Sequence, residues 1–488
     1  MSDRPGQTAH TARWERRSCI GLVALFVFLF PLALIHGDIQ TDEAWLGQQV
    51  LALVNTGEVA SALFRDVPPL DGHIVVYHKL LIWCGAAISR IAGWGILQLR
   101  LIPALAGLGV LLLLLFRPIA DSTRRVRFLA ASILAFTPLF WDYMRMFRPE
   151  MLLLVCGFAG YLVLERATVS RRLSAVAAAG ALTGLAGLSH AAGLAFVVAG
   201  VIALGIERQF KAAGLFVICA ALTFSPYLSG LITDPDLFGK QLFVNAFTDA
   251  RLSLAWWQPI TNLLSEHTRL FRKPEVIGLS VAFVLALALT TKSQWRQQRF
   301  FWVFLLTLIV AGGMAPLPKI TRYMLPLTPF FVLAIARAWA EPSENERIGR
   351  MVRKILVGWL VLFFAYGIFA LGSAALCNWS VQRDTNQWLS AQIEPGSIVM
   401  APFDFVFNGS NQYVVQSWWG CERAAHELPT PASVEEYASR TGVQYIILDS
   451  LRLAKLHLVP EQIPDSFRRY SPLLGLTARQ RYLLVRKE

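Results

Sequence analysis

Long apolar runs separated by short polar segments occupy most of this sequence up to residue 376. The first run spans Ile20 to Ile35, and later runs lie near residues 99–116, 127–141, 151–164, 173–188, 191–206, 212–231, 276–291, 300–316, 323–340 and 355–376. A helix needs about 20 mostly apolar residues to cross the roughly 30 Å hydrocarbon core of a bilayer. The pattern therefore predicts an all-α polytopic membrane protein with about 11 transmembrane helices.

The composition agrees with a membrane protein and excludes a soluble nucleic-acid-binding protein. Charged residues make up 16% of the chain, hydrophobic residues 55%, and the mean hydropathy is +0.50. Soluble domains are typically about 25% charged. The net charge of +13 arises mainly from Lys and Arg in short loops between the runs, where such residues set membrane orientation.

The basic loops predict the topology. If the N-terminus is cytoplasmic, the alternate loops on its side of the membrane are 117–127, 165–172, 207–211, 292–299 and 341–354, and all of them are basic. This distribution satisfies the positive-inside rule. It places the C-terminal region on the extracytoplasmic side.

Two regions outside the apolar runs have patterns of their own. In the first outer loop, residues 37–97, apolar residues follow a helical period after Asp42 and again after Asp71. Two amphipathic interface helices are expected, separated by a turn at Pro68-Pro69. We expect a transmembrane domain over residues 1–376 and an extracytoplasmic domain over residues 377–488.

The C-terminal domain has the pattern of a small α/β unit. Residues 397–401 and 444–449 are typical of buried strands, and residues 433–442 of a helix that ends at Gly442. Cys377 and Cys421 flank the polar part of this region. A disulfide between them requires an oxidising compartment.

Charged residues gather at the predicted outer ends of several spans. They are Asp42, Glu43, Asp142, Arg145, Arg148, Glu150, Lys319 and Arg322, and His190 lies between two spans on the same side. Charges next to hydrocarbon are expensive and indicate function by default. Carboxylates and cations that converge there would suit a phosphate-bearing substrate and a nucleophile that needs a base.

Each of these residues also has a purely structural interpretation. Asp42 would be a favourable cap for the helix that follows it. Arg145 and Arg148 would pair with the neighbouring carboxylates or with lipid headgroups, and Lys319 and Arg322 would anchor the interface. His190 fits a buried polar residue better than a metal ligand.

Five segments together resemble the GT-C membrane glycosyltransferases, in the branch of the protein O-mannosyltransferases and the lipid A aminoarabinose transferases. They are TDEAW (41–45), PPL (68–70), RLIPALAGL (100–108), RMFRPEMLLL (145–154) and TRYMLPLTPFFVLA (321–334). The resemblance lies in the order, spacing and common sidedness of the segments. It covers about residues 18–376, and the C-terminal domain resembles the family only in position and class.

The resemblance implies a reaction and roles for single residues. The donor would be a sugar on a polyprenyl phosphate, and an acceptor hydroxyl would attack the anomeric carbon with inversion. Asp42 matches the general base, and Glu43 would support it or contact the acceptor. The substrate-binding residues implied are Arg145, Arg148, Glu150, Lys319, Arg322, Tyr323 and His190.

Some positions depart from the branch. Val67 stands where a Lys often precedes PPL, which leaves Arg65 as the nearby cation, and His190 stands where a Lys is common. A divalent metal bound by Asp71 and His73 is a further hypothesis. Because the sequence offers no complete ligand set, we expect no obligatory metal or other cofactor.

The sequence thus predicts a hexosyl or pentosyl transferase at the outer face of the cell inner membrane. Its partners would be the bilayer, a polyprenyl-phosphate sugar and an envelope acceptor, with glycolipid or lipopolysaccharide favoured and protein hydroxyls second. An O-antigen ligase or polymerase is the alternative enzyme, although such enzymes tend to lack the first-loop acidic pair. A transporter is disfavoured because we find no internal repeat and the charges lie at the interface.

Overall fold

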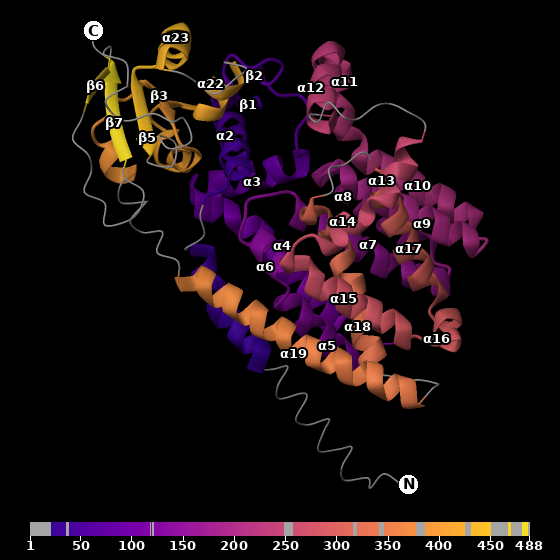
Figure 1. Cartoon of the computed structure of the whole chain (residues 1–488). Helices are drawn as coiled ribbons and strands as arrows, with labels where there is room; N and C mark the ends of the chain where they lie inside the picture. Colours follow the sequence, from indigo (N-terminus) through magenta and orange to yellow (C-terminus); the bar gives the residue numbers. More distant parts are fainter. Residues whose placement is uncertain are drawn as a thin grey trace.

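The computed structural model describes residues 21–35, 39–117, 119, 122–247, 257–315, 320–340, 346–376, 386–424, 431–449, 467–469 and 481–486. In these ranges helices form a large bundle, and strands occur in a two-stranded and a five-stranded sheet (Figure 1). The five-stranded sheet lies beside the bundle, next to α2 (Thr41–Thr56) (Figure 1). The predicted fold class, an all-α polytopic membrane protein with a small α/β domain, is confirmed.

Apolar helices coincide with almost all of the predicted spans. Within the described residues, five helical runs are long and apolar enough to cross a bilayer: α4 (Ile96–Phe116), α7 (Glu150–Ser170), the run Phe210–Thr233, the run Thr321–Ala340, and Gly349–Leu376 within α19 (Glu346–Leu376). The run Phe210–Thr233 contains α10 (Phe210–Phe224), η3 (Ser225–Leu228) and α11 (Ser229–Thr233), and the run Thr321–Ala340 contains η4 (Thr321–Leu327) and α18 (Thr328–Ala340). Shorter apolar helices are Gly21–Ile35, α8 (Leu173–Ser189), η2 with α9 (Ala191–Gly193 and Leu194–Ile206), α15 (Pro274–Leu289) and α17 (Arg299–Met314).

The third predicted span, 127–141, is not one continuous helix. It is divided into α5 (Arg124–Ala135) and α6 (Pro138–Met144). The break falls at Thr137, which has extended backbone angles because the proline that follows disfavours the helical conformation. The short α6 then leads into residues 145–149, which form part of the candidate site.

Small residues allow two of the bundle helices to pack closely. Gly180 and Gly184 lie one turn apart on α8, and a Cβ atom at either position would lie 2.4 Å from a backbone oxygen of α10. Side chains at these positions would therefore force the helices apart. Such spacing of small residues is typical of helix pairs packed within a membrane.

The first loop folds as predicted in one half and differently in the other. Helix α2 (Thr41–Thr56) buries Leu46 and Val50 against α3 (Lys79–Ala92) and α4. The helix expected from Asp71 begins only at Lys79. Residues before it run extended: β2 (Gly72–His73) pairs with β1 (Ala60–Ser61), which is followed by η1 (Ala62–Phe64).

A glutamine from a distant helix explains why residues 75 and 76 are not helical. Gln241 lies on α12 (Pro235–Phe247), and its Oε1 accepts hydrogen bonds from the backbone N–H groups of Val75 and Val76 at 2.9 and 3.1 Å. Those donors would otherwise seek partners within a helix.

Three further short helices lie elsewhere in the chain: α13 (Gln258–Leu264), α14 (Glu266–Phe271) and α16 (Lys292–Gln297).

The C-terminal sheet has strand order β4-β3-β5-β7-β6. Its elements are β3 (Ile398–Ala401), η5 (Phe403–Phe405), α21 (Val406–Gly409), β4 (Val414–Ser417), α22 (Trp418–Ala424), α23 (Pro431–Thr441), β5 (Tyr445–Asp449), β6 (Phe467–Arg469) and β7 (Arg481–Arg486). Strands β4, β3 and β5 are parallel, and β7 is antiparallel to both β5 and β6. The predicted strands β3 and β5 and helix α23 are present. Cys421 is a buried free thiol, and Cys377 lies outside the described residues.

Gln48 on α2 joins this sheet to the first loop. Its Oε1 accepts hydrogen bonds from the Ser61 hydroxyl at 2.9 Å and from the Ala62 and Leu63 N–H groups at 3.0 and 3.2 Å. Its Nε2 donates to the Val415 carbonyl of β4 at 2.9 Å. A single buried amide thus connects α2, η1 and the C-terminal sheet.

We predict that Gln48→Ala loosens this junction without unfolding the bundle. Leaving several buried groups unpaired costs about 1–3 kcal/mol each, so the Ala62 and Leu63 amides should exchange hydrogen faster, as measured by mass spectrometry in detergent. Gln49→Ala is the matched control, because the Gln49 amide has no hydrogen-bond partner. Unchanged exchange at both amides in Gln48→Ala would contradict this role.

Candidate active site

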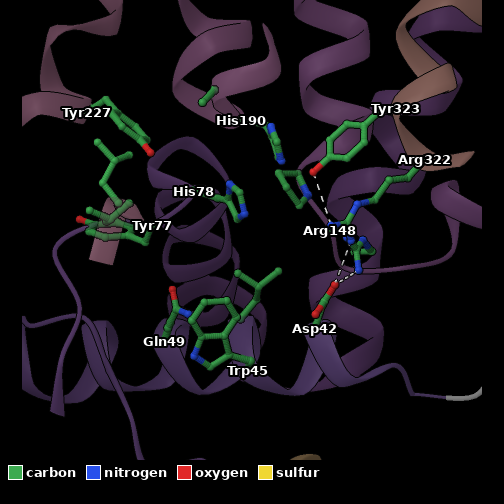
Figure 2. A pocket seen from close by; sticks show the side chains of 15 residues that line it. Asp42, Trp45, Gln49, Tyr77, His78, Arg148, His190, Tyr227, Arg322 and Tyr323 are labelled. Atoms are coloured by element: carbon green, nitrogen blue, oxygen red, sulfur yellow. Dashed lines mark hydrogen bonds and ion pairs between the residues drawn. The ribbon is translucent and has the colours of Figure 1, made fainter. Parts of the chain in front are cut away.

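A cavity of about 230 Å³ opens beside α2 at the end of the bundle nearest the C-terminal sheet. Its walls come from α2, the segment before α3, the turns before α7 and η2, and the start of η4 (Figure 2). The lining residues are Asp42, Trp45, Leu46, Gln49, Val76, Tyr77, His78, Arg148, Pro149, His190, Ala191, Tyr227, Leu242, Arg322 and Tyr323.

Three charged residues meet at one end of the cavity. Asp42 lies in the first turn of α2, and its carboxylate forms an ion pair with the Arg148 guanidinium. Arg322 Nη1 lies 3.6 Å from the same Asp42 Oδ2 (Figure 2). Gln40, not Asp42, is the N-cap residue of α2. Capping therefore does not account for Asp42, whose side chain is 41% exposed at the cavity.

The Arg148 guanidinium is oriented by a second carboxylate. Arg148 Nη2 donates to Glu150 Oε1 at 2.8 Å, and Nε lies 3.2 Å from both carboxylate oxygens. Glu150 is buried and opens α7, where its charge also favours the helix N-terminus. Glu150 fixes one edge of the guanidinium, so the Nη1 edge faces Asp42. It does not line the cavity itself.

Arg322 and Tyr323 enter the cavity from the start of η4. The Arg322 guanidinium carbon lies 5.1 Å from the centroid of the Tyr323 ring, within cation–π range. Its Nη2 is 3.5 Å from the Tyr323 hydroxyl, and its Nε is buried without a partner. Arg322 therefore keeps an unused donor at the charged end.

Glu43 is buried outside the cavity lining. Its oxygens accept hydrogen bonds at 2.8 Å from Arg100 Nε, Arg100 Nη2 and the Phe147 backbone N–H. A further bond at 2.9 Å comes from the N–H of Gln40. Because these bonds are all internal, they favour the first of the two expected roles, support of Asp42 by positioning it, over contact with the acceptor.

Arg145 also lies apart from the cavity. It pairs with Asp142, with Nη2 and Nε at 2.7 and 2.8 Å from Oδ1, and its guanidinium carbon is 5.5 Å from the Trp141 ring. The structural alternative considered from sequence, pairing with a neighbouring carboxylate, thus describes Arg145. Lys319 lies outside the described residues.

The other end of the cavity is polar but uncharged, and sequence reasoning missed most of it. Trp45, Gln49, Tyr77, His78 and Tyr227 lie there (Figure 2). Trp45 and Gln49 follow Asp42 by three and seven residues on α2, so all three lie on one helical face. Helical spacing from Asp42 could therefore have predicted that Trp45 and Gln49 face the cavity. Tyr77, His78 and Tyr227 reach it only through tertiary structure.

A pair of stacked histidines, His78 and His190, lines the cavity. The His78 and His190 rings stack with centroids 5.0 Å apart. Burial lowers the pKa of His78 to about 4 and, with His78 adjacent, that of His190 to about 3. A histidine whose pKa is lowered is neutral above that value, so both rings are uncharged at neutral pH.

Hydrogen bonds to the Nδ1 atoms define the two tautomers. His78 Nδ1 faces the Ser189 carbonyl at 3.1 Å, so it carries the proton and leaves Nε2 as an acceptor. His190 Nδ1 accepts from the Ala192 N–H at 3.1 Å, so its proton is on Nε2, which is a donor. The pair thus offers one acceptor and one donor.

Within the described part of the chain, no group of three or more His, Cys, Asp or Glu residues is arranged to hold a metal. The candidate ligands Asp71 and His73 are not part of the cavity lining. The expectation of no obligatory metal stays a prediction.

A second, largely apolar cavity of about 220 Å³ lies next to the first one. The two have Ala191 and Tyr323 in common, and the second extends between α9, α17 and η4 along Val198, Leu308 and Leu327. Its lining is mostly aliphatic and includes Arg269, which pairs with Glu266. A charged pocket and a largely apolar slot between helices therefore lie side by side.

Comparisons with known proteins show which proteins this chain is similar to. A family described as dolichyl-phosphate-mannose-protein mannosyltransferase matches residues 79–229. No curated protein matches the sequence. Among solved structures, ArnT from Cupriavidus metallidurans bound to undecaprenyl phosphate is similar with a TM-score of 0.61 and 13% identity, over 95% of this chain and 97% of that chain.

An archaeal enzyme has a more distant likeness. The Archaeoglobus fulgidus oligosaccharyltransferase, tethered to an acceptor peptide with the NVT sequon, gives a TM-score of 0.52 at 11% identity, over 96% of this chain and 74% of that chain. At such identities the likeness establishes the fold. The chain has the fold of the GT-C glycosyltransferase superfamily, and the resemblance inferred from sequence is confirmed.

We predict that the adjacent carboxylates Asp42 and Glu43 differ in their effect on stability. Glu43→Gln leaves the buried Arg100 without its counter-charge, and breaking a buried pair costs about 3–5 kcal/mol. Asp42→Asn removes a partly exposed pair, which costs about 0–1 kcal/mol. Thermal unfolding in detergent should give a clearly lower midpoint for Glu43→Gln only. Equal midpoints would contradict the positioning role of Glu43.

Proposed function

Because the chain has the GT-C fold, we propose that it is a glycosyltransferase that moves a sugar from a polyprenyl-phosphate donor to an envelope acceptor with inversion. One observation carries the proposal. A carboxylate and two guanidinium groups, those of Asp42, Arg148 and Arg322, meet in a cavity that lies next to a largely apolar slot. That combination suits a substrate with an anionic head and a hydrocarbon tail.

The phosphate of the donor would bind between Arg148 and Arg322. Guanidinium groups form strong paired hydrogen bonds with phosphate oxygens, and the buried Nε of Arg322 is a donor without a partner. The similar ArnT structure is bound to undecaprenyl phosphate, which supports a lipid phosphate as ligand. The isoprenoid tail would lie in the slot between α9 and α17.

Asp42 would act as the general base. The acceptor hydroxyl oxygen forms a bond to the anomeric carbon while the bond from that carbon to the phosphate oxygen breaks. The hydroxyl proton passes to the Asp42 carboxylate, and the electron pair leaves with the polyprenyl phosphate, whose charge the two arginines stabilise. A bound phosphate would draw both guanidinium groups from Asp42 and free the carboxylate for this step.

The acceptor favoured is a glycolipid or lipopolysaccharide. The sequence resembles the lipid A branch, and the likeness to ArnT extends over 97% of that chain. A protein hydroxyl is the second candidate, since the matched family is described as a protein mannosyltransferase. In both cases the site would face the extracytoplasmic side of the inner membrane, with the N-terminus in the cytoplasm.

A ligase or transporter role has weaker support. The charged residues that line the cavity, Asp42, Arg148 and Arg322, lie at or next to the starts of α2, α7 and η4. Transporters usually bind substrate near the bilayer midplane.

We predict that Asp42→Asn remains folded but loses transfer activity by about 10²–10⁴-fold, because proton removal is lost. The measurement is transfer of radiolabelled sugar from polyprenyl phosphate to lipopolysaccharide or to hydroxyl-bearing peptides in proteoliposomes. Turnover near wild type would remove Asp42 from the mechanism. Label found on the peptides alone would reassign the acceptor.

Arginine variants test the donor side. Arg322→Ala should raise the KM for the donor about tenfold or more, since a charge-assisted hydrogen bond is lost, while the KM for the acceptor changes little. Arg145→Ala is the matched control, because Arg145 pairs with Asp142 away from the cavity. Equal effects of the two substitutions would contradict the proposed phosphate site.

A further inference from the structure

The two ends of the cavity differ in charge, and the proposed phosphate site and general base account for only the charged end. Asp42, Arg148 and Arg322 are the charged groups among the described lining residues, and all three lie at one end (Figure 2). The other end carries Trp45, Gln49, Tyr77 and Tyr227, with His78 beside them. It is therefore rich in hydrogen-bonding groups but has no charge among the residues described.

Gln49 is the clearest sign that this end binds a ligand. Its side chain is fully buried, yet neither the amide nitrogen nor the amide oxygen has a hydrogen-bond partner. The Trp45 indole N–H, one helical turn away, is also buried and unpaired. Buried polar groups are nearly always paired, so several unpaired groups lining one cavity indicate that a ligand supplies their partners.

The groups available match the chemistry of sugar hydroxyls. Gln49 offers both a donor and an acceptor, Trp45 offers a donor, and the His78 Nε2 atom is an acceptor by the tautomer deduced above. A hydroxyl group both donates and accepts. The flat Trp45 indole also offers an aromatic surface for the apolar face of a pyranose ring.

The position of these groups fits a sugar attached to the phosphate. Gln49 follows Asp42 by seven residues on α2, a separation of about 10 Å along the helix. A donor whose phosphate lies between the arginines would place its anomeric carbon near Asp42. The far hydroxyls of a single pyranose would then point towards Gln49.

We propose that this end, formed by Trp45, Gln49 and His78, binds the transferred glycosyl group and selects an uncharged sugar over an amino sugar or a uronic acid. The inference rests on the proposed function and deepens it. A sugar ammonium or carboxylate would be buried there without a counter-charge on the residues that line this end, because the nearby Lys79 ammonium lies against the Tyr77 ring and donates to the Ser229 hydroxyl, outside this cavity. Burial of an unpaired charge is strongly unfavourable. A neutral hexose or pentose leaves no such charge.

The test uses three synthetic donors with the full-length protein in proteoliposomes. They are undecaprenyl phosphates carrying glucose, 4-amino-4-deoxyarabinose or glucuronic acid, together with sugar-free undecaprenyl phosphate. Binding is measured by competition against a radiolabelled glucosyl lipid, and transfer is measured in parallel. We expect the glucosyl lipid to bind about tenfold or more tightly than either charged-sugar lipid at pH 7 and to be the preferred donor.

Two substitutions at one position separate sugar recognition from structure. Gln49→Leu should weaken binding of the glucosyl lipid about tenfold, as expected for lost hydrogen bonds, and leave the affinity for sugar-free undecaprenyl phosphate unchanged. Gln49→Glu has the same shape but adds a carboxylate. It should shift the preference at least tenfold towards the amino-sugar lipid.

Each result decides between the two proposals. Tighter binding of a charged-sugar lipid by the wild type, or equal loss of sugar-free lipid binding in Gln49→Leu, would overturn the neutral-sugar subsite while leaving the transferase proposal intact. Absence of transfer from every donor, despite selective binding of the glucosyl lipid, would count against the transferase proposal and support the subsite. Absence of binding by all lipids would overturn both.

Discussion

The buried ion pair between Glu43 and Arg100 is the constraint on which the candidate site depends. Glu43 is next to Asp42 in the chain, and the backbone N–H that it binds belongs to Phe147, next to Arg148. One carboxylate thus sets the separation between the proposed base and the proposed phosphate ligand. Arg100 extends the link to the end of the first helix by donating to the Leu34 carbonyl at 3.2 Å. Buried charges are stable only when fully paired. The contacts of Glu43 with Arg100 and with the Phe147 N–H must therefore be kept together, and they hold α2 and the turn before α7 at a fixed separation.

The C-terminal sheet holds the opposite side of the same helix. Gln48 ties α2 to η1 and β4, while Asp42, Trp45 and Gln49 face the cavity on another side of α2. The Ser417 hydroxyl adds a bond at 2.6 Å to the Leu63 carbonyl, and the Tyr437 hydroxyl one at 2.9 Å to the Arg65 carbonyl. Helix α2 is therefore fixed between the bundle and the sheet. Its face with Asp42, Trp45 and Gln49 lines the cavity proposed to bind the substrate.

The sequence predicts the spans well because the bilayer imposes one strong requirement, a long apolar segment. It fails at two kinds of break. Pro138 interrupts the third span from within its own apolar run, and Gln241 of a distant helix binds the N–H groups of residues 75 and 76 and keeps them out of a helix. Within the site, the charge pattern marks Asp42, Arg148 and Arg322, which the structure brings together. The charge pattern does not show that Glu43 and Arg145 differ from these three residues. Glu43 pairs with Arg100, and Arg145 pairs with Asp142, so neither side chain faces the cavity. The helical spacing places Gln49 on the same face as Asp42, but only the structure shows that its buried amide has no hydrogen-bond partner. His78 carries no local signal, because its place in the cavity depends on tertiary structure.

A structure of the protein with undecaprenyl phosphate bound in a lipid nanodisc tests the account most directly. The account predicts phosphate density within hydrogen-bond distance of Arg148 and Arg322, with the tail in the slot between α9 and α17 and the Asp42 carboxylate turned away from both guanidinium groups. Density for the phosphate elsewhere, with Asp42 still paired to both arginines, would contradict it.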